Sequence, residues 1–227
     1  MFHPIPRPIF IILLIFITLP QQAQVSVGIN AGATRMKFSG DPPEGIGYFS
    51  PQAGYSTALQ LGYRFNNGFA LNVQPGYSIL RSKYSFWNDS ATRVVDSTYF
   101  KFKTFSLPLQ AVVWSPSGRF YVLAGFNLLY TLDFDGKVGI STTLASSVTY
   151  TVSEYNLFAE FGAGFIIPIG RPFLNFELRY SQGLNDMSTP LIHTNTELPR
   201  TKLTNINLLI GLHIPLGNPE VFSIIKK

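Results

Sequence analysis

Apolar and polar residues alternate along most of the chain. The clearest stretch lies between residues 173 and 182, where the apolar positions are Leu174, Phe176, Leu178 and Tyr180. The polar positions between them are Asn175, Glu177, Arg179 and Ser181. A period of two is typical of a β-strand whose faces meet different environments. The pattern predicts eight long strands, at about 25–37, 53–65, 69–84, 98–114, 119–132, 152–167, 173–182 and 202–216.

The connections between these strands alternate in length. Short turns rich in Gly, Asn and Pro lie at 66–68, 115–118 and 168–172. Long polar connections lie near 38–52, 85–97, 133–151 and 183–201. Short periplasmic turns and long extracellular loops alternate in this way in outer-membrane barrels. Each predicted strand also has the length, roughly 9–11 residues or more, that crosses a bilayer when tilted. The sequence therefore predicts an all-β fold, an eight-stranded antiparallel up-and-down transmembrane β-barrel.

A soluble sandwich or lipocalin-like barrel would show the same alternation, so composition has to decide. Charged residues make up 13% of the chain, about half the usual share of a soluble protein. Aromatic residues lie near the predicted strand ends, where two belts would meet two bilayer interfaces. They are Tyr63, Phe65, Phe69, Trp114, Phe120 and Phe173 near the short turns, and Tyr84, Phe86, Trp87, Tyr99, Phe102, Tyr130 and Tyr180 near the loops. Both features favour the membrane barrel.

The first residues have the parts of a secretory signal peptide. Arg7 precedes the apolar run 9–19, and Pro20 and a small residue, Ala23, follow it. The run is shorter than the roughly 20 residues that span a bilayer as a helix, although an uncleaved anchor stays an alternative. We expect a cleaved signal peptide over 1–23, the barrel over 24–217 and a short periplasmic tail over 218–227. The expected location is the cell outer membrane, as a multi-pass protein.

The interior of an eight-stranded barrel is just wide enough for side chains to fill it. The charged residues expected to face inward are Arg64, Glu160, Glu177 and Arg179, with Asn72 and Asn175 among the amides around them. Buried polar groups require partners, so we expect these side chains to pair with one another and fill the lumen. A narrow polar pore gated by the same residues is the alternative.

Candidate catalytic residues are few. The chain contains no Cys, which excludes disulfides, thiolate zinc sites and a cysteine nucleophile. His193 lies in the last long connection with Asp186, Ser188 and Glu197, so a Ser/His/acid set acting on lipid A or peptides is conceivable. We predict no catalytic residue, cofactor or metal, and interpret His193 as a solvated loop residue. His213 is expected to face inward near the periplasmic end.

Basic residues flank the second long connection. Arg81, Lys83, Lys101 and Lys103 are expected at the extracellular rim, where cations can bind the phosphates of lipopolysaccharide. Solvated charge without a ligand is the alternative reading. Nucleic acid is not an expected partner for a secreted, membrane-embedded chain. The expected partners are outer-membrane lipid, lipopolysaccharide and envelope-complex proteins.

Several segments resemble the PorT-like outer-membrane β-barrel family of Bacteroidota. They are the Gln-Ala-Gln at 22–24, the Gly-rich 27–32, the Leu-Gly-Tyr-Arg-Phe at 61–65, the Phe-Ser-Leu-Pro-Leu at 105–109 and the Ile-Pro-Leu-Gly at 214–217. The resemblance covers the mature chain and implies a porin-like barrel. Function is mostly unassigned in that family, and its name comes from a member linked to a protein secretion system. No residue marks this chain as that member.

These observations predict a non-enzymatic outer-membrane barrel. Its expected role is structural or binding, or that of an accessory subunit of an envelope complex for secretion or assembly. A barrel enzyme acting on lipid A or peptides, and a narrow pore, are the alternatives.

Overall fold

The computed structural model describes residues 24–39, 47–66, 68–89, 94–139, 153–186 and 202–216. The expected signal peptide over 1–23, the tail over 218–227 and the loop residue His193 lie outside the described residues. No helix within these ranges is long and apolar enough to cross a membrane, which has no bearing on crossing by β-strands.

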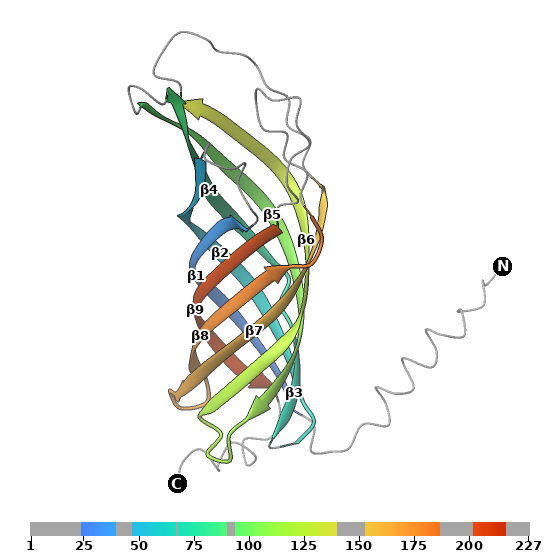
Figure 1. Cartoon of the computed structure of the whole chain (residues 1–227). Coiled ribbons are helices and arrows are strands. Elements are labelled where there is room, and N and C mark those ends of the chain that lie inside the picture. Colours follow the sequence, from blue (N-terminus) through green and yellow to red (C-terminus); the bar gives the residue numbers. More distant parts are fainter. Residues whose placement is uncertain are drawn as a thin grey trace, which may run out of the picture.

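The described residues form nine strand elements, ordered by sequence in Figure 1. They are β1 (Gln24–Ser39), β2 (Gly47–Arg64), β3 (Phe69–Val73), β4 (Gly76–Asp89), β5 (Val94–Trp114), β6 (Phe120–Gly139), β7 (Tyr155–Pro168), β8 (Phe173–Gly183) and β9 (Lys202–Leu216). Each pairs antiparallel with its neighbours in the sheet.

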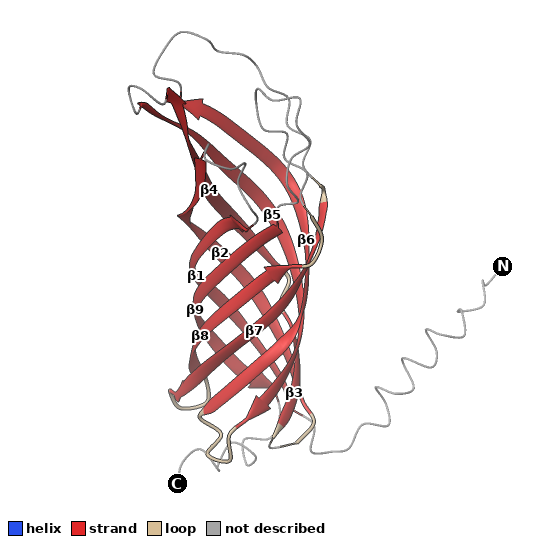
Figure 2. Ribbon diagram, in the orientation of Figure 1, coloured by secondary structure: helices blue, strands red, loops and turns tan. Residues whose placement is uncertain are grey.

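The sheet closes on itself. β9 pairs with β1 and β1 pairs with β2, so the meander ends where it began (Figure 2). β3 and β4 both lie between β2 and β5 and form one interrupted strand, which makes a ring of eight. Closure leaves no unpaired strand edge exposed to lipid. The predicted eight-stranded antiparallel up-and-down barrel is therefore confirmed.

Proline causes the interruption between β3 and β4. Pro75 has no N–H to donate to the ladder, but its carbonyl oxygen accepts from the backbone N–H of Leu59 at 3.0 Å. Gln74 donates its N–H to the carbonyl oxygen of Pro108 at 3.1 Å. The wall is thus continuous across the break.

Three short connections lie at one end of the barrel, which we call the turn end; the opposite end is the loop end. Gly118 and Gly170 adopt positive φ values of 67° and 74° in two of these turns, a backbone region that Gly enters without steric cost. Both glycines had been expected in turns.

Strands β2, β4, β5 and β6 all extend into segments where the sequence pattern predicts long connections, at 47–52, 85–89, 94–97 and 133–139. β5 and β6 contain 21 and 20 residues, and with β4 they rise beyond the other strands at the loop end in Figure 1. The prediction that residues 133–139 belong to a long connection is wrong. Asp133 and Asp135 instead pair with Lys103 and Lys101 across β5 and β6, which extends the ladder with polar side chains.

The outer face of the wall is apolar, with outward side chains such as Leu59, Phe126 and Leu208. The expected aromatic belts are partly wrong. Phe120, Tyr99 and Tyr180 are exposed on the outer face, but Tyr84, Phe102 and Phe173 are buried and belong to apolar clusters. Distance from a strand end therefore predicted the height of these rings but not which side of the wall they occupy.

Candidate functional site

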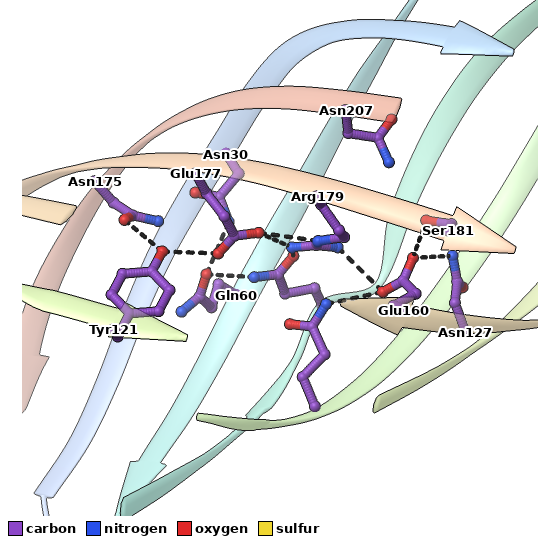
Figure 3. Close-up of polar contacts among 12 residues, drawn as sticks. Asn30, Gln60, Tyr121, Asn127, Glu160, Asn175, Glu177, Arg179, Ser181 and Asn207 are labelled. Atoms are coloured by element: carbon purple, nitrogen blue, oxygen red, sulfur yellow. Dashed lines mark hydrogen bonds and ion pairs between the residues drawn. The ribbon is translucent and has the colours of Figure 1, made fainter. Parts of the chain in front are cut away.

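Buried polar side chains meet in the middle of the lumen. Figure 3 shows that they come from strands all around the ring and point toward one another. The charged members are Glu160 of β7 and Glu177 and Arg179 of β8, none more than 4% exposed. We call this group, with the amide and hydroxyl side chains that bond to it, the lumen cluster.

Arg179 is the centre of the lumen cluster. Its Nε donates to Glu177 Oε1 at 2.9 Å, and its Nη2 also bonds to Glu177 Oε1. Nη2 donates to Gln74 Oε1 at 2.7 Å, across the barrel from β8. Nη1 lies 3.5 Å from Glu160 Oε2. One guanidinium thus joins three side chains from three strands.

Glu160 accepts hydrogen bonds from neutral donors as well. Gln110 Nε2 donates to Oε2 at 2.9 Å, and Ser181 Oγ and Asn127 Nδ2 donate to Oε1 at 2.9 and 3.0 Å. Tyr121 donates its hydroxyl toward Glu177 Oε2, at 2.8 Å. One arginine faces two carboxylates, so its single positive charge cannot balance both negative charges. The hydrogen bonds from these neutral donors stabilise the buried carboxylates in place of a second cation.

The hydrogen bonds continue toward the turn end. Gln74 Nε2 donates to Gln60 Oε1 at 2.6 Å, and Asn30 Nδ2 donates to the same oxygen at 2.8 Å. Asn30 Oδ1 lies 2.9 Å from Nε2 of His213, whose ring stacks on Phe173. Polar contacts therefore connect β8 to β4, β2, β1 and β9 across the lumen.

The structure brings together most of the charged residues expected in the lumen. Glu160, Glu177 and Arg179 are in contact, and Asn175 accepts a hydrogen bond from Tyr121 at 2.6 Å. Asn72 is buried and lines a cavity at the turn end. Arg64 is placed differently: its guanidinium lies 5.0 Å from the centre of the Trp114 ring, and its Nε donates to the carbonyl oxygen of Asn66 at 3.1 Å.

Several members of the lumen cluster were missed from the sequence. Gln60, Gln110 and Tyr121 all lie at inward positions of their strands, so the alternation already contained the signal for them.

Two small cavities flank the lumen cluster. One, of about 40 Å³, lies at the turn end between Arg64, Asn72, Trp114 and His213. Another of about 40 Å³ is lined by Gln74, Glu160, Arg179 and Asn207. Each has room for a few water molecules. The arrangement suits closure of the tube.

A second group closes the lumen at the loop end, and it is apolar. We call it the aromatic cluster; its buried members are Met36, Phe38, Leu80, Tyr84, Phe100, Phe102, Leu129, Phe158 and Leu203. Phe38 and Phe100 meet edge to face with ring centroids 5.4 Å apart, and Phe134 packs 4.8 Å from Phe102. In this half of the lumen, apolar side chains are therefore added to buried polar ones such as Ser82 and Asn156.

The four predicted basic residues lie on the outer face at the loop end. Arg81 pairs in register with Lys101, and the ammonium of Lys83 lies 5.5 Å from the centre of the Tyr99 ring. Lys103 Nζ bonds to Asp133 Oδ2 at 2.7 Å. This hydrogen bond raises the pKa of Lys103 and lowers the pKa of Asp133. The exposed cations Arg35, Lys37 and Lys202 lie at the same end and were not predicted.

Within the described ranges, no three His, Asp or Glu side chains are arranged to hold a metal ion. The described histidine, His213, lies in the lumen near the turn end, as expected from the alternation.

The chain is similar in fold to several small outer-membrane barrels. Ail of Yersinia pestis, solved with the heparin analogue sucrose octasulfate, is 16% identical over 84% of this chain and 99% of Ail, with a TM-score of 0.40. Neisserial surface protein A is 16% identical over 83% and 96%, with a TM-score of 0.42. OprG of Pseudomonas aeruginosa is 14% identical over 86% and 96%, also at 0.42. No curated protein sequence matches the chain.

The family comparison covers most of the sequence. The family described as "Outer membrane protein beta-barrel domain" matches residues 20–189, which include seven of the eight strands of the ring. With the closed antiparallel ring and its apolar outer face, this match places the chain in the outer membrane protein β-barrel family.

Proposed function

We propose that this protein is a closed, non-enzymatic outer-membrane barrel that works by binding rather than by conduction. The observation that supports this most is the lumen cluster, in which Arg179 bonds to Glu177 on its own strand, to Glu160 on the neighbouring β7 and to Gln74 across the tube. A solute crossing at this height would have to separate buried ion pairs, and leaving one partner of such a pair unmatched costs several kcal/mol, about 3–5.

The proposed orientation follows the general rule for such barrels. Short turns face the periplasm and long loops face the outside, so the turn end is periplasmic and the loop end is extracellular. Binding then takes place at the loop end, where β4, β5 and β6 rise beyond the other strands (Figure 1). Lipopolysaccharide is the proposed lipid partner of Arg81, Lys83, Lys101 and Lys103.

We further propose that the barrel is an accessory subunit of an envelope complex. A closed tube with no conduction pathway needs a partner to act on, and the tall β4–β6 wall offers a surface for one. The signal peptide over 1–23 and the periplasmic tail over 218–227 are part of the same proposal, since the chain has to reach the outer membrane by secretion.

A pulldown from detergent-extracted outer membranes tests the accessory role. The tagged, full-length protein is isolated in its native state and its companions are identified by mass spectrometry. We expect one envelope protein in stoichiometric amount. A barrel recovered alone, yet still shifting on gels when heated, contradicts the accessory role and leaves a stand-alone surface protein.

His193→Ala, with lipid A composition as the readout, tests the enzyme alternative: altered lipid A contradicts the non-enzymatic proposal.

A further inference from the structure

The outer wall of the barrel carries a groove of about 670 Å³. Its lining includes Ile29, Ala31, Thr57, Leu59, Tyr77 and Phe105, from β1, β2, β4 and β5. The groove forms because outward positions at its centre are small, Ala31 and Thr57, whereas Ile29 and Leu59 beside them are large. Its volume lies in the range of ligand-binding clefts, about 300–1,000 Å³.

A second hollow lies on the same face, closer to the loop end. It measures about 290 Å³, and Gln52, Arg81, Tyr99, Lys101 and Asp135 are among its lining residues. With Lys83 and Lys103 included, this region has four basic side chains against the carboxylates of Asp133 and Asp135, a net charge of +2. Asp133 bonds to Lys103. Arg81 and Lys101 line the hollow itself together with one carboxylate, Asp135, which is the register partner of Lys101, so the lining has a net charge of +1.

The two hollows are aligned along neighbouring strands. Tyr77 pairs in register with Phe105 at the upper end of the groove, and Arg81 pairs with Lys101 further toward the loop end. The two pairs are separated by four residues along β4 and by four residues along β5. At about 3.3 Å per residue, the cations therefore lie roughly 13 Å beyond the aromatic end of the groove.

We propose that the groove and the cationic hollow form one binding site for the lipid A part of lipopolysaccharide. The phosphate binds Arg81 and Lys101, and an acyl chain passes Tyr77 and Phe105 into the groove. This assignment rests on the proposed orientation, which puts the loop end in the outer leaflet. Charge complementarity selects the occupant: a neutral lipid would leave the two cations unused, and a soluble anion would leave the groove unused.

Equilibrium binding of fluorescent bis-phosphorylated lipid A to the folded, full-length protein in detergent tests the site. We expect Arg81→Gln with Lys101→Gln to weaken binding about tenfold or more, since charge-assisted bonds are lost. Ala31→Phe, which fills the groove, should weaken it by a similar factor. Dephosphorylated lipid A should bind weakly to the native protein. Its affinity should not fall further in the variant with Arg81→Gln and Lys101→Gln.

Two matched controls separate the site from general effects. Arg119→Gln with Arg171→Gln removes two exposed cations at the turn end, and Ala163→Phe adds a ring to an exposed alanine of β7. Both should bind lipid A like the native protein. Equal loss in controls and site variants, or no loss in the site variants, overturns the proposal. So does phosphatidylglycerol binding as tightly as lipid A, which would indicate a general anionic-lipid surface.

Conductance of the same preparation keeps this test separate from the proposed function. If the barrel conducts no current and does not bind lipid A, the proposed lipid site is contradicted and the closed lumen is not. A conducting barrel that binds lipid A overturns the closed lumen alone.

Discussion

The lumen cluster and the aromatic cluster close the same tube by opposite means. Around Arg179, charged and amide groups are buried and each charged side chain has bonded partners. Around Phe102, apolar rings pack against one another with no charge among them. Burying ions is costly unless they are paired, whereas apolar packing has no such condition. The stability of the middle of the barrel therefore depends on a few specific ion pairs and hydrogen bonds. The stability of the loop end depends on how completely apolar side chains fill the available volume.

Removing the arginine should have the largest effect on stability. Arg179→Met leaves Glu160 and Glu177 buried without their cation, and we expect a loss of about 3–5 kcal/mol in the free energy of unfolding. Urea unfolding of the refolded protein in detergent measures it.

The matched control neutralises the whole set. Arg179→Met combined with Glu160→Gln and Glu177→Gln should recover most of the loss, because no buried charge is left unmatched. If the single and triple variants are equally unstable, the contribution of Arg179 is packing rather than charge.

The aromatic cluster should respond to lost volume instead. Phe102→Ala removes a ring that is 1% exposed, and we expect a loss of about 3 kcal/mol, the lower end for Phe-to-Ala changes in cores. Phe126→Ala on the lipid-facing side is the control, and the same unfolding assay should give a much smaller change. Equal losses at the two positions would contradict an inner apolar core at the loop end.

Sequence periodicity predicted the ring and the charged centre of the lumen. A strand has two faces, so once Glu177 and Arg179 were assigned to one side, Asn175 followed on the same side. The aromatic cluster follows the same alternation, since Phe102 has the parity of Gln110 on β5 and Tyr84 has the parity of Gln74. It was missed because aromatic residues near strand ends were assigned to membrane belts by their height and not by their face.

Arg64 and the cationic hollow show a second limit of prediction from the sequence. The alternation predicts that Arg64 faces the lumen beside the other charged residues. In the structure Arg64 lies near the end of β2 at the turn end, so its guanidinium contacts Trp114 and not Glu177. Likewise, the sequence put Arg81 and Lys101 in two predicted strands near the extracellular rim but did not show that they are register partners. The register between β4 and β5 makes them neighbours on the outer wall, and the groove beside them is contributed by strands distant in sequence.

The smallest effect is expected for the exposed ion pair. Lys103 and Asp133 are also bonded, at 2.7 Å, but their side chains are 41% and 52% exposed. Water and ions screen such pairs, so Lys103→Met should leave the unfolding transition unchanged within error. A loss as large as that of Arg179→Met would mean that burial does not separate the two ion pairs.

Single-channel recording in planar bilayers tests the closed lumen most directly. The folded native protein, with heat-dependent gel migration as the check on folding, should give no discrete current steps. Arg179→Met should also stay silent, because the aromatic cluster still closes the loop end. Discrete, reproducible steps from the native barrel would contradict closure of the lumen and identify the protein as a narrow pore.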